Sequence, residues 1–228
     1  MGKLSDIGIK MTYEEIKKNE EINLLIARGN EVLGALGYTE HSKKHAAKVA
    51  ATAGKILKEL GYKKDQIELA KIAGYMHDIG NSINRHDHAQ SGGILAYQIL
   101  KELKMPLADA MIIASAIGNH DEGTGTAIDI VSAALILADK TDVRRNRVRN
   151  QVIATFDAHD RVNYAVLSVK LSVDKEKKVI QMDMELDDTM CTVMDYFEIF
   201  LQRMMMCRRA AEVLGCKFKL TANGSKLC

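Results

Sequence analysis

Six of the seven histidines lie between positions 41 and 120, on stretches that also carry acidic residues. Imidazole and carboxylate groups are ligands that transition-metal ions take in proteins. His77 and Asp78 are adjacent at the end of a predicted helix, just before Gly80. Neighbouring helical side chains diverge by about 100°, so His77 can bind one ion while Asp78 bridges to a second. Because an apolar run precedes them, we expect an ion or hydrogen bonds to satisfy both groups.

The sequence predicts a series of consecutive helices over its first 150 residues, and these helices must position the residues above. A capping-box pattern at Thr12 and Glu15 begins the first predicted helix, and Thr39 is expected to cap the second, which places His41 and His45 on one face. The apolar periodicity predicts helices over residues 12–36, 39–61, 65–78, 89–103, 107–118 and 129–141, with an alternative in which the last continues toward Asn150.

The C-terminal third changes to a period of two. Residues 167–173 and 180–186 alternate apolar and polar side chains, which predicts a hairpin. A methionine-rich helix over 190–214 and a strand over 216–220 follow. We therefore predict a mainly α fold with two parts, a helical body over residues 1–155 and a small α+β subdomain, strand-strand-helix-strand, over 156–228. The methionines favour core packing or a dimer seam, and a homodimer is a further hypothesis.

Composition narrows the class of protein. The 228 residues carry a net charge of only +2, which gives no argument for binding a nucleic-acid duplex or a membrane surface. The four cysteines lie in the last 38 residues, show no C-x-x-C pair and follow no secretory signal. With no apolar run of membrane-spanning length, these features favour a protein of the cytoplasm. The absence of a G-x-x-x-x-G-K-[ST] motif argues against a nucleotide-driven motor or kinase.

The ordered set His45, His77-Asp78 and Asp139 resembles the H…HD…D signature of the HD-domain superfamily of metal-dependent phosphohydrolases. Val49-Ala50 stands four residues after His45, as in the family pattern, and Ala138-Asp139-Lys140 supplies the last motif. The resemblance covers roughly residues 39–150 and implies an HD helical bundle. It also implies the metal ligands: a first ion bound by His45, His77, Asp78 and Asp139, and a second, as in two-metal members, bound by His88, His120 and the shared Asp78.

The resemblance also suggests residues for catalysis. His41 precedes the ligand His45 as in cyclic-nucleotide phosphodiesterases, where the earlier histidine protonates the leaving oxygen, so His41 is the candidate general acid, with a supporting or surface role as the alternative. Asp78 and Lys140 complete the candidate catalytic set. The basic run after Asp139 suggests a phosphate clamp by Arg144, Arg145 and Arg147, although a solvated charged face or contacts to the C-terminal subdomain would have the same composition. The Gly-Tyr-Pro tripeptide of cyclic-dinucleotide phosphodiesterases is absent, which argues against that substrate.

The predicted function is hydrolysis of a phosphomonoester or phosphodiester, nucleotide-like or small, with hydroxide activated by one or two divalent ions. Iron or manganese is preferred, and zinc, cobalt and nickel also suit the ligand set. Two alternatives remain open. Some HD-fold proteins hold two irons in the same pattern and act as oxygenases, and an HD protein can also be a non-catalytic nucleotide sensor or scaffold.

Overall fold

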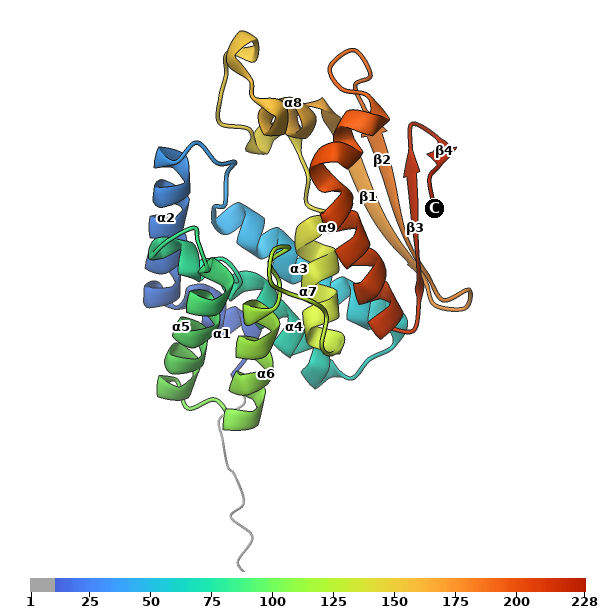
Figure 1. The fold of residues 1–228 in the computed structure, drawn as a ribbon. Coiled ribbons are helices and arrows are strands. Elements are labelled where there is room, and N and C mark those ends of the chain that lie inside the picture. Colours follow the sequence, from blue (N-terminus) through green and yellow to red (C-terminus); the bar gives the residue numbers. More distant parts are fainter. Residues whose placement is uncertain (1–10) are drawn as a thin grey trace, which may run out of the picture.

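Nine α-helices and a four-stranded sheet make up residues 11–228, the part of the chain that this computed structural model describes (Figure 1). The helices are α1 (Tyr13–Lys18), α2 (Glu20–Ala35), α3 (Lys43–Leu60), α4 (Lys64–Met76), α5 (His88–Glu102), α6 (Leu107–Gly118), α7 (Ile130–Lys140), α8 (Ala158–Ala165) and α9 (Val193–Val213). The strands are β1 (Val166–Asp174), β2 (Val179–Leu186), β3 (Lys217–Ala222) and β4 (Ser225–Lys226). The predicted fold class, a helical body followed by a small α+β part, is confirmed.

Helix α7 is the central helix of the body. Every residue from Val131 to Ala138 is buried, as expected of a helix that is apolar on all sides. It packs against α3, α4, α6 and α9. Asp129 caps its N-terminus by accepting a hydrogen bond from the Ser132 N–H. The last turn of this buried helix therefore delivers Asp139 and Lys140 into the interior of the protein.

Helices α3 and α4 form the most extensive helix pair in the described chain. They approach closely at Gly74, where a Cβ atom would lie only 2.8 Å from the Cα of Ala50. This contact explains why glycine stands in the middle of a buried helix despite its low helix propensity. The close approach also fixes the relative height of His45 on α3 and His77 at the end of α4.

The sheet has the strand order β1-β2-β3-β4. β1 and β2 are antiparallel, as the predicted hairpin requires, whereas β2 and β3 are parallel and are joined through α9. A parallel pair needs such a crossover. α9 lies across one face of the sheet and also packs on α7 (Figure 1). The sheet is thus joined to the helical body by α9, and also by contacts of α3 and α8 with β1.

Four details of the predicted elements are wrong. Residues 12–36 form two helices, because Asn19 is extended, ends α1 and caps α2. α3 begins after the N-cap Ser42, so His41 lies before the helix instead of one turn below His45. The helix predicted over residues 129–141 is confirmed as α7, but its alternative extension toward Asn150 is wrong, because α7 ends at Lys140 and a 3-10 turn over Arg145–Arg147 follows. The short helix α8 and the strand β4 were not predicted.

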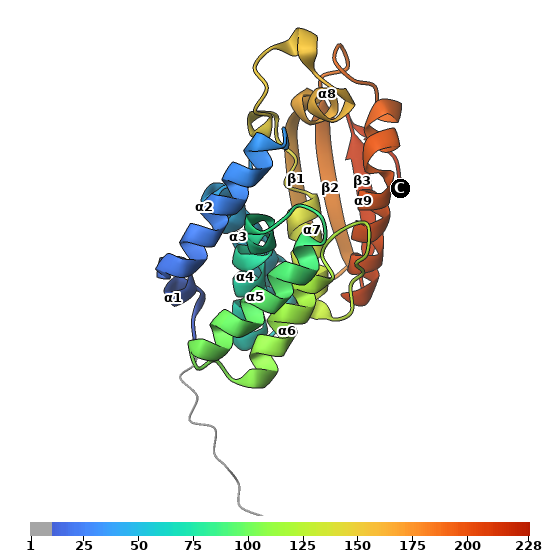
Figure 2. The same cartoon turned by 60° about the vertical axis from the view of Figure 1, so that its left-hand side comes forward.

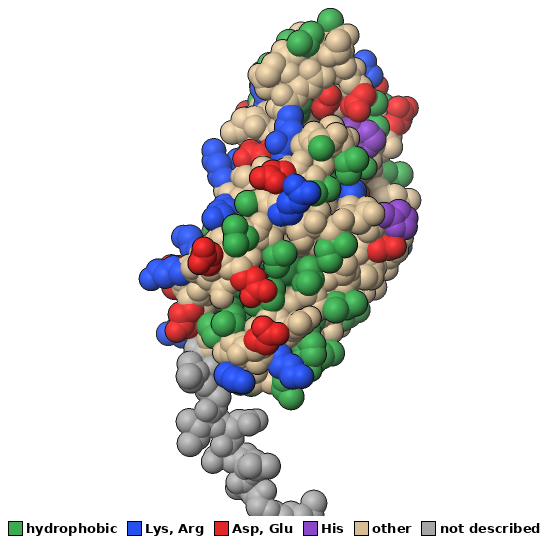
Figure 3. All heavy atoms as spheres, turned by 90° about the vertical axis from the view of Figure 1, so that its left-hand side faces the viewer, with side chains coloured by type: hydrophobic (Ala, Val, Ile, Leu, Met, Phe, Trp, Pro, Cys, Tyr) green, Lys and Arg blue, Asp and Glu red, His purple; other side chains and the backbone are tan. Residues whose placement is uncertain are grey.

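One hydrophobic core contains residues of both the helical body and the C-terminal part, including Leu135 of α7, Met182 of β2 and Cys207 of α9. The boundary at residue 155 stays a prediction, and the first ten residues of the predicted helical part lie outside the described chain. Met204 and Met206 are buried, which agrees with core packing. Exposed apolar side chains are scattered over the face shown in Figure 3, and the homodimer stays a prediction.

Candidate metal centre

All six predicted metal ligands meet at one point, although they come from five separate segments. They are His45 in α3, His77 at the C-cap of α4, Asp78 directly after it, His88 at the start of α5, His120 just after α6 and Asp139 in the last turn of α7. Each of the four histidines is no more than 3% exposed. The histidines and acidic residues that the sequence predicted to converge thus lie together in the structure.

Two imidazole pairs form the centre. The Nε2 atoms of His45 and His77 are 3.3 Å apart, and those of His88 and His120 are also 3.3 Å apart. Asp78 lies between the pairs. Its Oδ2 is 3.0 Å from His77 Nε2 and 3.6 Å from His45 Nε2, and its Oδ1 is 3.7 Å from His88 Nε2 and 3.9 Å from His120 Nε2.

Hydrogen bonds determine the tautomer of all four rings. Each Nδ1 faces an acceptor: Asp142 Oδ2 for His45 at 2.8 Å, Gly74 O for His77 at 2.9 Å, Arg85 O for His88 at 3.1 Å and Ile117 O for His120 at 2.6 Å. The proton of each neutral ring is thereby assigned to Nδ1, and the Nε2 lone pair points into the centre. Four lone pairs that converge with carboxylates repel one another unless a cation lies among them.

Three further observations fit a bound cation. The buried Oδ2 of Asp78 has no hydrogen-bond partner among the described residues, which is costly unless an ion binds it. Asp139 Oδ1 lies 3.4 Å from His45 Nε2 and 3.5 Å from His77 Nε2. Three overlapping groups have ligand atoms within 4.8 Å of one another: His45, His77 and Asp78; His77, His120 and Asp139; and Asp78, His88 and His120. The donor set therefore fits a divalent metal.

The electrostatics of the centre agree with this conclusion. Burial opposes a charge on His77, yet the carboxylates of Asp78 and Asp139 raise its pKa to about 10. Without a metal, a proton on His77 Nε2 would supply the positive charge that the carboxylates require; a metal ion bound there would replace that proton and leave the ring neutral. Burial and the neighbouring His77 lower the pKa of His120 to about 3, so its ring is neutral at pH 7 and suited to metal binding.

His41, the candidate general acid, lies beside the centre. Its Nε2 is 4.0 Å from Asp78 Oδ2, and its Nδ1 is 2.7 Å from the carbonyl oxygen of Thr39, to which it donates. Burial lowers the pKa of His41 well below its ordinary value. The ring is therefore neutral at pH 7 and its Nε2 is an acceptor, which favours a role in taking up a proton over the predicted role in donating one.

A cavity of about 490 Å³ opens over the ligands Asp78, His88, His120 and Asp139. Its walls come from the segment after α2, from α8 and from α9, which surround one end of the helical body in Figure 2. The volume is in the range of sites for small molecules. Lys140 lies in the wall, with its Nζ 2.8 Å from Asp139 Oδ2 and 3.4 Å from Glu122 Oε1.

Only one arginine of the predicted phosphate clamp lines this cavity. Arg147 does so, and it donates to the carbonyl oxygens of Glu40 and Asp142. Arg144 instead forms a bidentate ion pair with Asp142. Arg145 donates to Asp187 and to the Tyr164 carbonyl. Because neither is among the cavity-lining residues, the geometry gives Arg144 and Arg145 structural contacts and leaves their substrate role unsupported.

Sequence reasoning missed three residues of the site. Arg85 lines the cavity and its Nη1 lies 3.3 Å from His88 Nε2. Glu122, which was not among the predicted site residues, pairs with Lys140 and with Arg203 of α9. Arg203 also lines the cavity. The adjacency of Glu122 to the predicted ligand region was the one signal in the sequence, and nothing in it connected α9 to the centre.

Comparison with known proteins gives the family. The HD domain model matches residues 43–161, more than half of the chain. The uncharacterized protein MJ1020 of Methanocaldococcus jannaschii is 30% identical over 194 residues, which cover 75% of this chain and 74% of that protein. The chain therefore belongs to the HD domain family, and its converging histidines and carboxylates form a donor set that fits a divalent metal.

Ribonucleases Y are also similar. That of Oceanobacillus iheyensis is 30% identical over 130 residues, covering 55% of this chain and 23% of that protein, and that of Wolinella succinogenes is 33% identical over 149 residues, covering 65% and 26%. The chain spans about a quarter of these two relatives. A crystal structure of a predicted HD superfamily hydrolase from an uncultured Thermotogales bacterium aligns with a TM-score of 0.43 at 23% identity, covering 54% of this chain and 67% of that one.

Among residues 11–228, helices long and apolar enough to cross a membrane are absent.

Proposed function

We propose that the protein hydrolyses a small phosphoester at a centre that holds two divalent ions. The observation that carries this proposal is the position of Asp78, whose two carboxylate oxygens face different histidine pairs. A carboxylate between two such pairs is suited to bridge two ions. His45, His77 and Asp139 would complete one site, and His88 and His120 the other.

The ions would polarise the phosphoryl group and lower the pKa of a bound water. We propose iron or manganese as the ions, because both accept a mixed set of imidazole and carboxylate ligands. Zinc, cobalt and nickel are the alternatives. The cavity residues have separate tasks. Lys140 and Arg147 provide positive charge beside the ligands for the negative phosphoryl oxygens, and the acceptor Nε2 of His41 would take up a proton.

The cavity of about 490 Å³ supports a small phosphorylated substrate such as a nucleotide. Because the similar ribonucleases Y are named for cleaving RNA, a phosphodiester is the first class to test. We take no more than this substrate class from the ribonucleases Y, since this chain spans only about a quarter of their length.

The test combines metal analysis with a phosphoester screen. Purified protein is expected to contain close to two equivalents of metal after loading with Mn²⁺ or Fe²⁺ and to hydrolyse phosphoesters without oxygen. His77→Ala is expected to lose metal and turnover, while His86→Ala, which changes an exposed histidine, keeps both. Activity that requires oxygen would instead indicate the oxygenase, and nucleotide binding without turnover would indicate the sensor.

A further inference from the structure

Arg203 reaches the metal centre from α9, far beyond residue 161, where the match to the HD domain model ends. It lines the same cavity as Lys140, Arg147 and the predicted ligands. Only 24% of its side chain is exposed. The C-terminal part of the chain therefore contributes a cation to the cavity wall in addition to covering the sheet.

Two contacts hold the guanidinium of Arg203 in place. Its Nε donates to Glu122 Oε1 at 2.7 Å, and its Cζ lies 4.2 Å from the centre of the Phe200 ring, a favourable cation–π distance. The same oxygen of Glu122 also lies 3.4 Å from Lys140 Nζ. The side chain is thus orientated before any ligand arrives, which reduces the entropy lost on binding.

The terminal nitrogens of Arg203 have no hydrogen-bond acceptor among residues 11–228. A guanidinium carries five N–H donors, and those on the terminal nitrogens of Arg203 are accessible from the cavity, since neither nitrogen is among the fully buried polar atoms without a partner in the described chain. A purely structural role, holding the loop that carries Glu122, would need only Nε. The free N–H groups of Arg203 indicate a ligand that is not part of the polypeptide.

The surrounding charge indicates the sign of that ligand. Lys140, Arg147 and Arg203 lie around one cavity, near enough for the charge of Arg203 to oppose the charges of the other two. Asp78 and Asp139 are committed to the metal in the proposed function, and Glu122 is shared between two cations. The cavity lining also includes a fourth cation, Arg85, and the carboxylates of Asp157 and Asp160. An anion in the cavity would relieve this repulsion. A planar fork of donors matches phosphate oxygens in particular.

We propose that Arg203 is a phosphate-binding residue of the centre, orientated by Glu122 and Phe200, and that it donates to the non-bridging oxygens of the phosphoryl group. This inference rests on the proposed phosphoester function. It replaces the predicted clamp of Arg144 and Arg145 by one in which α9 supplies the arginine.

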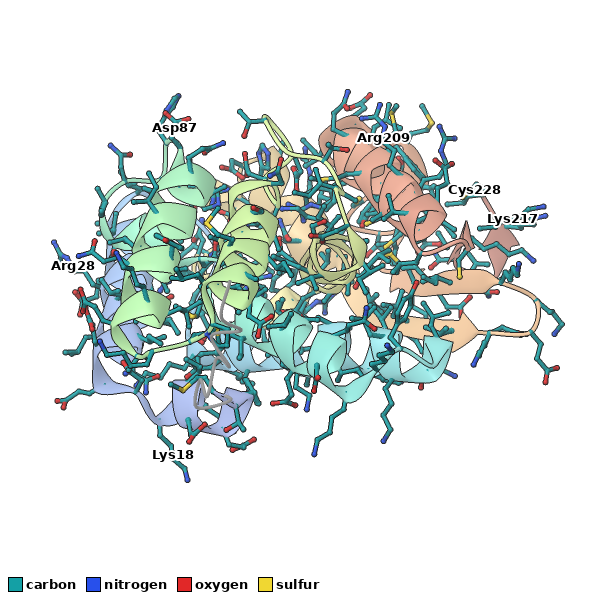
Figure 4. The ribbon with its side chains drawn as sticks, turned by 90° about the horizontal axis from the view of Figure 1, so that it is seen from below. Lys18, Arg28, Asp87, Arg209, Lys217 and Cys228 are labelled. Atoms are coloured by element: carbon teal, nitrogen blue, oxygen red, sulfur yellow. The ribbon has the colours of Figure 1, made fainter. Side chains whose placement is uncertain are left out.

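The test measures binding of inorganic phosphate to the Mn²⁺-loaded full chain by isothermal titration calorimetry. Arg203→Gln is expected to weaken binding about 10- to 100-fold, and Arg203→Lys, which keeps the charge without the fork, to weaken it less. Glu122→Gln should also weaken binding, since it loosens the guanidinium. The control is Arg209→Gln on the same helix, at an exposed position labelled in Figure 4, which should bind as the unsubstituted protein does.

Manganese content and circular dichroism of each variant separate binding from folding. The proposal requires Arg203→Lys and Arg203→Gln to retain their metal and helicity. It is overturned if phosphate binds Arg203→Gln as tightly as the unsubstituted protein, if the unsubstituted protein binds no phosphate, or if phosphate affinity falls only together with metal content. If Arg203→Gln binds phosphate more weakly than the unsubstituted protein, but the unsubstituted protein hydrolyses no phosphoester, only the proposed function is refuted. Normal binding by Arg203→Gln in an active phosphoesterase would refute this inference alone.

Discussion

His45 donates its Nδ1–H to the buried carboxylate of Asp142 at 2.8 Å, and this bond turns the opposite ring nitrogen toward the metal centre. The Asp142 side chain is only 1% exposed. It also accepts from Lys48 at 2.7 Å and from Arg144 at 2.8 and 2.9 Å. A carboxylate behind a ligating histidine fixes the ring orientation and increases its basicity.

Replacing Asp142 with asparagine should therefore weaken metal binding about 10- to 100-fold. The amide keeps the size of the side chain but removes the charge that His45, Lys48 and Arg144 share. Competition with a chelator gives the dissociation constant. Asp188→Asn, at an exposed position, is the control. Equal metal affinity in the Asp142→Asn and control proteins would show that the His45 orientation is set by packing alone.

His41→Gln should lower kcat about 100-fold and leave the metal content unchanged. The reason is that His41 Nε2 lies 4.0 Å from the nearer oxygen of Asp78, close to the centre but outside the three groups of converging ligand atoms. Turnover of a phosphoester and elemental analysis of the same samples check both statements. Loss of metal in this variant would instead identify His41 as a ligand.

The convergence of the six candidate metal ligands could be predicted from the sequence because their signal is local. His77 and Asp78 are neighbours at a helix end, and His45 is marked by the Val49-Ala50 pair that follows it. Each motif needs only its own helix to be recognised. The helical packing then brings the motifs together, and the close contact at Gly74 is one of the places where that packing is determined.

The cavity wall could not be predicted, because its pairings are long-range. Glu122 and Arg203 are 81 positions apart, and their contact depends on how α9 packs against α7. The predicted phosphate clamp in the basic run after Asp139 was only partly supported for a related reason: the number of basic residues in a segment does not tell which way each side chain points. After α7 ends, Arg144 turns to Asp142, Arg145 to Asp187 and only Arg147 to the cavity.

Gly80→Ala should destabilise the fold by about 1–3 kcal/mol through overpacking. A Cβ atom at this position would collide with the carbonyl oxygen of His88 and lie 2.6 Å from the Gly92 nitrogen. Since His88 begins α5, the substitution should also reduce binding of a second metal equivalent. Thermal unfolding and metal titration measure the two effects.

The matched control is Gly118→Ala at the end of α6, where nothing lies within 4 Å of the added Cβ. Alanine is favoured over glycine in a helix by up to about 1 kcal/mol, so this variant should be as stable as the unsubstituted protein or slightly more so. If both alanine variants unfold at the same temperature, close packing at Gly80 is not what requires glycine there.

Glu68→Gln should reduce stability at neutral pH by about 1 kcal/mol and have a smaller effect in acid. Glu68 on α4 accepts from the Tyr13 backbone N–H at 3.0 Å and from Lys71 Nζ at 2.7 Å, and so ties α1 to the body. Burial, the largest single influence, acts to raise the pKa of Glu68, but the hydrogen bonds from Lys71 and the Tyr13 N–H, together with the charges of Lys71 and Lys64, outweigh it, and the pKa lies below the usual 4.5.

The sign of the pH dependence follows from that direction. Because the pKa of Glu68 is lower in the folded than in the unfolded state, its contribution is fully present above the unfolded-state value and disappears as the pH falls through the folded-state value. Urea unfolding of metal-free protein at pH 7 and at pH 3 should thus show a difference between Glu68→Gln and the unsubstituted chain that shrinks in acid. Glu198→Gln, at an exposed position, controls for the change in net charge. A difference that stays constant between the two pH values would mean that the ionised carboxylate of Glu68 does not hold α1 in place, because only an ionised group can lose its contribution on protonation.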